Sequence, residues 1–313
     1  MRLSVVNIVA ACNDPALVES ATATVLEVAA RHPARVIVLD ANREGDAVIE
    51  SDIALRQSDG TGPIELVRLR VRGQPALHLS SIVQPLLVPD IPVNLWLVGA
   101  PPLEQAFRSD AVTLCDVIII DSAAFSDAAA TVRLLQQQLD AFGDALHLGD
   151  LAWERLRPWR EAVAHAFEGA AMRPWLQRIA TVDIVSAGAA SALESWLLAG
   201  WFASRLERHG GAHPRLRLSM VPRASHAHTE PARVRIASTH GHHVARVELG
   251  RRGHALHTSI DVDSGVVASR VTSLERLTDS ALLAALIGDA DDDPIYAEAV
   301  SAALQLIKVN THG

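Results

Sequence analysis

Histidines concentrate in one stretch of this 313-residue chain, and imidazole is a common ligand of zinc, copper and nickel. Seven of the 14 histidines lie there: His226, His228, His240, His242, His243, His254 and His257. Cysteine and acidic residues do not accompany them at a metal-binding spacing, and the sequence has no HExxH motif. We favour solvated turn residues at a hairpin tip around 240–243, and a metal-binding module remains the alternative.

Arginines overlap this stretch. Residues 213–257 hold eight arginines but only two acidic residues, Glu230 and Glu248. Such a positive face could bind phosphate, an acidic protein or RNA. Aromatic residues that would stack on RNA bases are not interleaved with these arginines, so we favour a solvated sheet face and expect no nucleic-acid partner.

Groups for covalent catalysis are sparse. The sequence has no GxSxG motif, and its only lysine is Lys308, which excludes a P-loop. The small-residue turn from Ser186 to Ser191 could hold an anion at a helix start, but it lacks GxGxxG, and Ser191 is better explained as a helix cap.

Asp121 ends an apolar run, where α/β proteins often place functional groups. A sugar-phosphate or nucleotide enzyme with its site near Asp121 and residues 98–100 therefore stays open. The absence of a coherent catalytic set predicts instead a protein that is not an enzyme and needs no cofactor.

The first part of the chain alternates strand and helix patterns. Strands are predicted at 3–10, 35–40, 52–57, 64–71, 92–98 and 112–121, and helices at 14–31, 74–87 and 127–140. This order predicts a mostly parallel sheet covered on both faces. The apolar segment 78–99 contains three prolines, so we expect a helix end, a turn at Asp90 and a buried strand led by Pro92.

The second part has a different pattern. Short tryptophan-rich helices are predicted within 151–180, then a strand at 181–186 and a helix from Ser191 to Arg208. Alternating runs predict strands at 215–221, 233–238, 244–249 and 255–262, with arginines on the polar side of an antiparallel sheet. Helices are expected at about 272–288 and 294–307.

These patterns together predict an α/β protein with two domains. Residues 1–145 form a mostly parallel βαβ domain, and residues 146–313 form an α+β domain with an antiparallel sheet and Trp-rich helices.

Composition narrows the class of protein further. Residues 1–140 carry a formal charge of −7 and residues 141–313 carry −1, so the first part is acidic. The apolar runs are too short to span a membrane, and we read the N-terminus as a strand without a secretory signal. Cys12 and Cys115 are far apart in sequence, which fits buried thiols in the cytoplasm and leaves open whether they are redox-active.

Tryptophan and arginine gather in one short run that contains Trp153, Trp159 and Arg160. These residue types are enriched at protein-binding hot spots, and they also fill domain cores. Both roles, partner contact and packing, are left open.

Several of these runs resemble one known family. They are His32–Val38, Glu65–Arg70, Ile82–Trp96, Asp150–Arg155, Trp159–Arg160, Leu198–Arg205 and Asp293–Tyr296. In this order the chain resembles the glucose-6-phosphate dehydrogenase assembly protein family, OpcA.

The resemblance implies a non-enzymatic partner that binds glucose-6-phosphate dehydrogenase. It would favour the active oligomer of that enzyme in the oxidative pentose phosphate pathway, and hence NADPH production. The candidates for contacting the partner, or for fixing the contacting surface, are Asp90, Pro92, Trp96, Trp153, Trp159 and Arg160.

Overall fold

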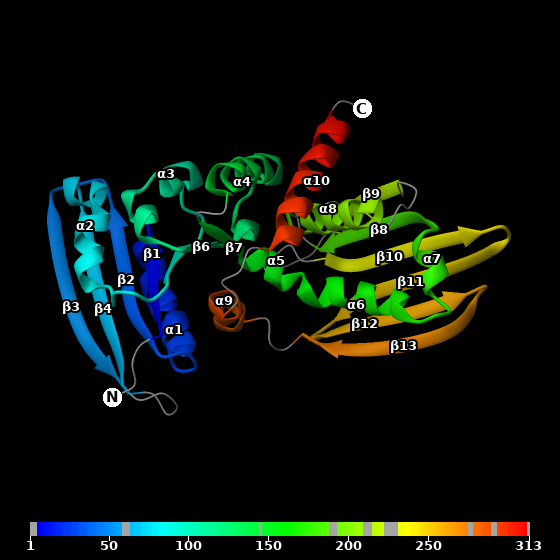
Figure 1. Ribbon diagram of the computed structural model, residues 1–313, viewed down its shortest axis with the longest axis horizontal. Helices are drawn as coiled ribbons and strands as arrows, with labels where there is room; N and C mark the ends of the chain where they lie inside the picture. Colours follow the sequence, from blue (N-terminus) through cyan, green and yellow to red (C-terminus); the bar gives the residue numbers. More distant parts are fainter. Residues whose placement is uncertain are drawn as a thin grey trace. The chain divides into compact units, whose positions relative to one another are not determined.

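The computed structural model describes residues 5–57, 63–143, 146–187, 193–208, 215–221, 231–274, 278–288 and 293–311 (Figure 1). These residues form two compact units, each with its own sheet. The first unit comprises Met1–Ala124, Gln138–Leu151 and Thr278–Asp292, and the second comprises Phe125–Gln137, Ala152–Leu277 and Asp293–Gly313. The units interleave along the chain, and the division into domains 1–145 and 146–313 stays a prediction.

A seven-stranded sheet forms the centre of the first unit. Its strands are β1 (Val6–Cys12), β2 (Ala34–Asn42), β3 (Val48–Arg56), β4 (Ile64–Arg72), β5 (Val93–Val98), β6 (Val117–Ile120) and β7 (His147–Asp150). Their order is β3-β4-β2-β1-β5-β6-β7, and all pairs are parallel except β3 with β4. Every residue of β5 and β6 is buried, as expected for strands covered on both faces. The predicted mostly parallel sheet is confirmed.

Short helices connect these strands. They are η1 (Pro15–Leu17), α1 (Val18–Ala29), η2 (Gln74–Leu77), α2 (Leu79–Val83), η3 (Gln84–Leu86), α3 (Leu103–Phe107), η4 (Asp110–Leu114) and η5 (Ser122–Ala124). A late helix, α9 (Asp279–Gly288), also belongs to this unit and packs against α1. The chain passes between the units within α4 (Ala128–Phe142) and α5 (Leu151–Arg155).

Two sequence predictions for this unit are wrong. The helix expected at 74–87 is three short pieces, because His78 leaves the helical conformation with a φ of −128° and Pro85 lies where α2 gives way to η3. The strand expected at 112–121 is a strand only over 117–120. Its first half is the 3-10 helix η4, whose Asp110 carboxylate accepts hydrogen bonds from the backbone N–H and hydroxyl of Ser80.

The proline-rich segment before β5 is held by a buried asparagine. Asn7, 0% exposed on β1, accepts a hydrogen bond from Val88 N and donates from Nδ2 to the carbonyls of Val88 and Ile91. The turn at Asp90 is confirmed, and this residue has a left-handed φ of 63°. One side chain therefore satisfies backbone groups that the prolines prevent from joining a helix or sheet.

A six-stranded sheet forms the second unit. Its strands are β8 (Ile179–Ala187), β9 (Arg215–Val221), β10 (Pro231–His240), β11 (His243–Arg252), β12 (Ala255–Val262) and β13 (Gly265–Ser273), in the order β13-β12-β11-β10-β8-β9. The predicted antiparallel pairing holds except for β9, which pairs with β8 in parallel. The predicted helix from about 272 is wrong at its start, because β13 runs to Ser273. A two-residue turn at Asp263 and Ser264, both with positive φ, folds β13 back onto β12.

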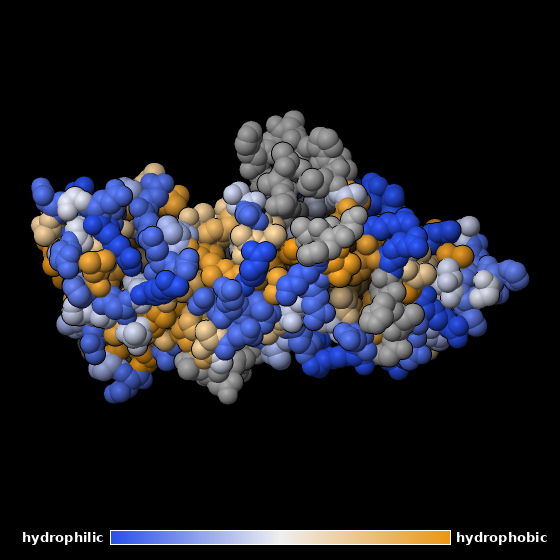
Figure 2. All heavy atoms as spheres, turned by 90° about the horizontal axis from the view of Figure 1, so that it is seen from above, coloured by the Kyte–Doolittle hydropathy of each residue, from blue (hydrophilic) through white to orange (hydrophobic). Residues whose placement is uncertain are grey.

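One face of this sheet packs on helices and the other is open. Val234, Ile236, Val247 and Leu249 are buried on the side that meets α6 (Arg157–Glu168), α7 (Arg173–Leu176) and α8 (Leu193–Arg208). The opposite face carries the arginines predicted there: Arg215, Arg217, Arg233, Arg235 and Arg246. Figure 2 shows hydrophilic residues dominating the end of the view that carries the β10–β11 hairpin.

Helices α8 and α10 (Pro294–Thr311) pack against each other at a glycine. A Cβ placed on Gly200 would lie 2.1 Å from the carbonyl oxygen of Ala299 and 2.8 Å from the backbone nitrogen of Ala303. Any side chain at position 200 would force the two backbones apart. Beside this contact, Glu298 on α10 forms ion pairs with Arg205 and Arg208 on α8.

Candidate functional site

Trp153 is the centre of a cluster in the second unit, formed by α5, α6 and the start of α10. We call Trp153, Arg160, Asp293 and Tyr296 the Trp153 cluster. The Trp153 residue is 2% exposed, and its ring lies 5.5 Å from the ring of Tyr296, centre to centre. The Arg160 guanidinium carbon lies 3.5 Å from the centre of the Trp153 ring, a cation–π contact.

Asp293 joins the cluster to the start of α10. Its Oδ2 accepts a hydrogen bond of 2.6 Å from the indole N–H of Trp153, and its Oδ1 accepts from the backbone N–H groups of Ile295 and Tyr296. Pro294 occupies the first helical position, where a missing N–H costs nothing. One carboxylate therefore caps the helix and fixes the indole.

Arg160 is a charged group held in a partly buried place. Burial lowers the pKa of its guanidinium to about 10, while the carboxylates of Asp293 and Glu154 oppose that shift, so the group is charged at neutral pH. Its Nη2 donates to the carbonyl of Trp153 at 3.2 Å. Its buried Nε has no hydrogen-bond partner within the part of the chain that the structure describes. The geometry ties α6 to α5 through one side chain.

A buried ion pair joins α5 to α8. Arg155 Nη1 lies 3.2 Å from Glu194 Oε1 on α8, and both side chains are almost fully buried. Truncating one partner of such a pair leaves an uncompensated charge, which is strongly destabilising. The pair makes the relative position of α5 and α8 specific.

The six predicted site residues fall into two groups. Asp90, Pro92 and Trp96 belong to the first unit, and Trp153, Trp159 and Arg160 belong to the second. Asp90 and Pro92 are exposed before β5, whereas Trp96, Trp153 and Trp159 are buried. Of the two roles predicted for these tryptophans, burial favours fixing a surface over touching a partner. Among the six, the structure brings Trp153 and Arg160 together.

Sequence reasoning missed Asp293 and Tyr296 as members of the cluster. Asp293 is 140 residues from Trp153, and no local pattern indicates their contact. The Asp-Pro dipeptide is a sequence signal for a helix start, and here it precedes the helix expected at 294–307. The second use of the carboxylate, as an indole acceptor, has no such signal.

The histidine hairpin is confirmed. His240 ends β10 and His243 begins β11, with Gly241 at a positive φ of 61° between them. The described residues hold no group of three or more histidines, cysteines or acids arranged for a metal, and His226 and His228 lie outside them. His243 instead lies 2.6 Å from Asp263. The backbone N–H of Val244, then His243, lowers the pKa of the Asp263 carboxyl.

The remaining candidates have structural roles. Asp121 Oδ1 accepts from the backbone N–H of Ala123, so it caps the turn after β6. Ser186 hydrogen-bonds Ser195 of α8, while the predicted cap Ser191 lies outside the described residues. None of the described helices has a stretch both long and apolar enough to span a membrane.

The fold and these clusters define a class: a two-part α/β protein whose charged and aromatic clusters join helices to one another. Two family models match the chain in succession. One, described as the glucose-6-phosphate dehydrogenase subunit N-terminal domain, matches residues 25–137, and the other, described as the C-terminal domain of that subunit, matches residues 146–300. The chain belongs to this family, OpcA.

Curated relatives agree with this assignment. Proteins of Synechococcus elongatus and Nostoc punctiforme are each 28% identical, over 57% and 58% of this chain. Both carry the name OpcA and are provisionally assigned to the OxPP cycle. The matches cover only 41% and 39% of those proteins.

Solved structures are more distant. An oxidoreductase domain protein from Kribbella flavida is 9% identical, with 99% of this chain and 97% of that chain covered and a TM-score of 0.42. A likeness at this level carries no argument about activity.

Proposed function

We propose that this protein is a non-enzymatic partner of glucose-6-phosphate dehydrogenase that binds the enzyme in the cytoplasm and favours its active oligomer. The observation that carries the proposal is the pair of family matches, both described as domains of a glucose-6-phosphate dehydrogenase subunit. The polar clusters are consistent with it, because the groups described above stabilise helix contacts.

The proposed mechanism needs no bond-breaking chemistry in this chain. A partner that binds one oligomer of an enzyme more tightly than another shifts the enzyme toward that oligomer. The shift cannot exceed the difference between the two binding free energies. NADPH production then rises because more of the dehydrogenase is in its active form.

The open face of the second sheet is the surface that we propose meets the enzyme. It carries exposed Arg233, Arg235 and Arg246 in its middle strands. At the edge strand β13, Val266 is 71% exposed and Val271 is 59% exposed, and their register partners Asp261 and His257 place them on this same face. Arginine beside apolar side chains is typical of protein-binding surfaces.

The predicted site residues take supporting roles in this proposal. The Trp153 cluster holds α5, α6 and α10 together, and α6 packs beneath β11 and β12. It therefore supports the open face from behind. Asp90 and Pro92 are exposed on the first unit and remain candidates for a separate contact.

The direct experiment mixes this protein with the glucose-6-phosphate dehydrogenase of the same cell. We expect a complex of defined mass by size-exclusion chromatography with light scattering. We also expect a changed dependence of dehydrogenase rate on glucose 6-phosphate concentration. The proposal would be contradicted if the mixture showed no complex and no change in the kinetics of the dehydrogenase. Turnover by this chain alone would favour the alternative of an α/β enzyme.

Variants locate the contact. Val266→Asp with Val271→Asp should weaken the complex at least about tenfold, because each charge opposes burial of that face. Val5→Asp is the matched control, since Val5 is 57% exposed just before β1 in the first unit and is not part of this sheet. If the control weakens the complex equally, the open face is not the contact. If instead Ile53→Asp on β3 weakens it, the contact lies on the first unit.

A further inference from the structure

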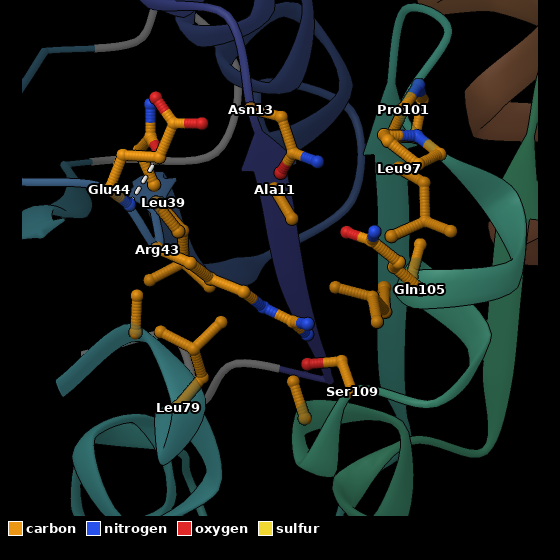
Figure 3. A pocket seen from close by; sticks show the side chains of 17 residues that line it. Ala11, Asn13, Leu39, Arg43, Glu44, Leu79, Leu97, Pro101, Gln105 and Ser109 are labelled. Atoms are coloured by element: carbon orange, nitrogen blue, oxygen red, sulfur yellow. Dashed lines mark hydrogen bonds between the residues drawn. The ribbon is translucent and has the colours of Figure 1, made fainter. Parts of the chain in front are cut away.

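The first unit contains a pocket of about 270 Å³ that the proposed function does not use (Figure 3). Its floor is apolar and includes Leu39, Leu79, Leu95 and Leu97. Its rim is polar and includes Asn13, Arg43, Gln105 and Ser109. We propose that this pocket binds a small organic anion, a carboxylate or phosphate monoester attached to a compact apolar group.

The pocket lies at the place where open α/β sheets bind ligands. Its lining comes from the carboxyl ends of three neighbouring parallel strands: Ala11 on β1, Ala41 on β2 and Leu97 on β5. The strand order reverses at β1, because β2 lies on one side of it and β5 on the other. The crevice at such a switch point is the preferred ligand site of this sheet type.

Donor groups converge on the space. Figure 3 shows the Arg43 side chain extending across the pocket toward Ser109, with the amides of Asn13 and Gln105 projecting into the same space. Within the described part of the chain, these four side chains have no hydrogen-bond or ion-pair partner. A guanidinium with a hydroxyl and two amides is a donor set that suits a carboxylate or phosphate.

Among the described residues that line the pocket, the one acidic side chain is that of Glu44, and it does not neutralise Arg43. Glu44 follows Arg43 on the same loop, and Figure 3 places its carboxylate on the far side of the rim from the guanidinium. Glu44 N donates to Asn42 Oδ1 at 2.8 Å, which closes a turn in this loop. The turn sends the two side chains in different directions.

The loop that carries Arg43 is fixed by a glycine. Gly73 has a φ of +66°, and a Cβ there would lie 2.6 Å from the carbonyl oxygen of Gly45. The Gly73 N–H also donates to the carbonyl of Asn42. The rim therefore has a defined position before any ligand arrives, which lowers the entropic cost of binding.

The volume of the pocket and the sequence of the turn after β1 indicate which class of ligand fits. A volume of about 270 Å³ is at the small end of ligand sites. The turn after β1 is Asn13-Asp14-Pro15, which lacks the glycines that let a backbone approach a pyrophosphate, and Pro15 has no N–H to donate. Both observations disfavour a dinucleotide and favour a single anionic group.

The experiment titrates the full chain with phenyl phosphate, benzoate and inorganic phosphate by isothermal calorimetry, with benzyl alcohol as the neutral analogue and NAD⁺ as the dinucleotide. We expect saturable binding of phenyl phosphate or benzoate, at least about tenfold tighter than benzyl alcohol, because the charge pairs with Arg43. Saturable binding of inorganic phosphate alone would show that the apolar floor is not used, and would overturn the assigned class. Saturable NAD⁺ binding that competes with phenyl phosphate would overturn it as well.

Variants test the site without the dehydrogenase partner. Arg43→Ala should weaken anion binding about tenfold. Arg31→Ala should change nothing, since Arg31 is also exposed but lies at the other end of the strands, after α1. Ala106→Phe should fill the pocket and block binding. If Ala106→Phe fails to fold, Arg43→Ala still tests whether the pocket binds anions, because Arg43 is exposed. Unchanged binding by Arg43→Ala, or no saturable binding of any anion, overturns the proposal.

Discussion

A single carboxylate can hold two elements together when each of its oxygens has a separate partner. Asp293 does this in the second unit, with Oδ1 on the first turn of α10 and Oδ2 on the indole of Trp153. The Trp153 ring is buried, so the indole N–H loses its acceptor inside the protein if the carboxylate is removed. The position therefore costs more to change than an ordinary helix cap.

Asp293→Ala should lower the free energy of unfolding by about 2–4 kcal/mol, the sum of a lost cap and an unpaired buried N–H. Asp293→Asn should restore only part of this stability, because its single amide oxygen can accept at the helix start or from the indole but not at both. Urea denaturation followed by tryptophan fluorescence measures both.

The chain offers a matched control in its other Asp-Pro helix start. Asp14 caps η1 by accepting from Ala16 N at 2.9 Å, and it is exposed with no described partner beyond that turn. Asp14→Ala should cost only about 0.5–1 kcal/mol. Equal losses at Asp14 and Asp293 would show that the indole hydrogen bond contributes nothing.

The two free cysteines should make stability depend on pH. Burial raises the pKa of Cys12 and of Cys115 to about 12 from the ordinary 9.0, with Asp40 and Asp14 adding to the shift at Cys12 and Asp116 at Cys115. Above pH 9 the unfolded chain loses these protons while the folded chain keeps them. The free energy of unfolding should then fall by up to about 1.4 kcal/mol per pH unit for each thiol.

Urea denaturation at pH 8, 9 and 10 measures this fall. The double variant Cys12→Ala, Cys115→Ala should lack the part of this fall that comes from the two thiols. The difference in the free energy of unfolding between wild type and variant should therefore shrink as pH rises. A difference that is constant across these pH values would mean that the thiols ionise equally in both states. Rapid modification of Cys12 by a disulfide reagent at pH 8 in the folded protein would contradict its burial.

At the scale of elements, Gly200 decides how closely two helices pack. Replacing a helical glycine with alanine ordinarily stabilises a helix by about 1 kcal/mol. Here the added Cβ meets the backbone of α10, which cannot turn aside as a flexible side chain would. We expect Gly200→Ala to destabilise the protein by about 2 kcal/mol or more, through separation of α8 from α10.

Gly169→Ala is the control, because a Cβ at Gly169 has nothing within 4 Å. Thermal unfolding of both variants should show a clear decrease in Tm for Gly200→Ala and little change for Gly169→Ala. If Gly200→Ala is neutral or stabilising, the helices are farther apart than the structure places them.

Periodicity predicted the elements wherever local sequence decides them. The strands β1, β2, β4 and β5 and the arginine-bearing hairpin strands follow apolar alternation or apolar runs, and all were predicted. The segment 112–121 failed because distant side-chain contacts fix it. Asp110 binds Ser80, and Asp116 accepts from Val93 N at 2.8 Å, and neither contact leaves a local pattern.

The candidate site was likewise predicted from the sequence only in part. Residue type alone indicated Trp153 and Arg160, since tryptophan and arginine in one run are uncommon. Burial favours fixing a surface over touching a partner, and burial depends on packing that sequence pattern does not show. The pocket at the switch point needs the strand order, so Arg43 had no sequence signal at all.

At the scale of the whole molecule, the division at residue 145 predicted from the sequence differs from the division into two compact units. A domain of residues 1–145 would lack β7 and α9, yet both belong to the first compact unit. Leu282, Leu283 and Ile287 of α9 are buried, and Leu286 lies within 3.3 Å of a Cβ built at Gly149 on β7. Each of the three buried side chains contributes at most about 1.5–3 kcal/mol, which together is a large share of a small domain's stability.

We therefore expect residues 1–151 joined through a flexible linker to residues 278–288 to be more stable than residues 1–151 alone, by several kcal/mol in urea denaturation. The same fusion with Leu283→Asp is the control, because the linker and helix length are kept while a fully buried side chain becomes charged. If the fusion and the control are equally stable, α9 does not belong to this unit, and the simpler division at residue 145 is the better description. If only the intact fusion is stabilised, the first unit is completed by a helix that the chain supplies more than 120 residues later.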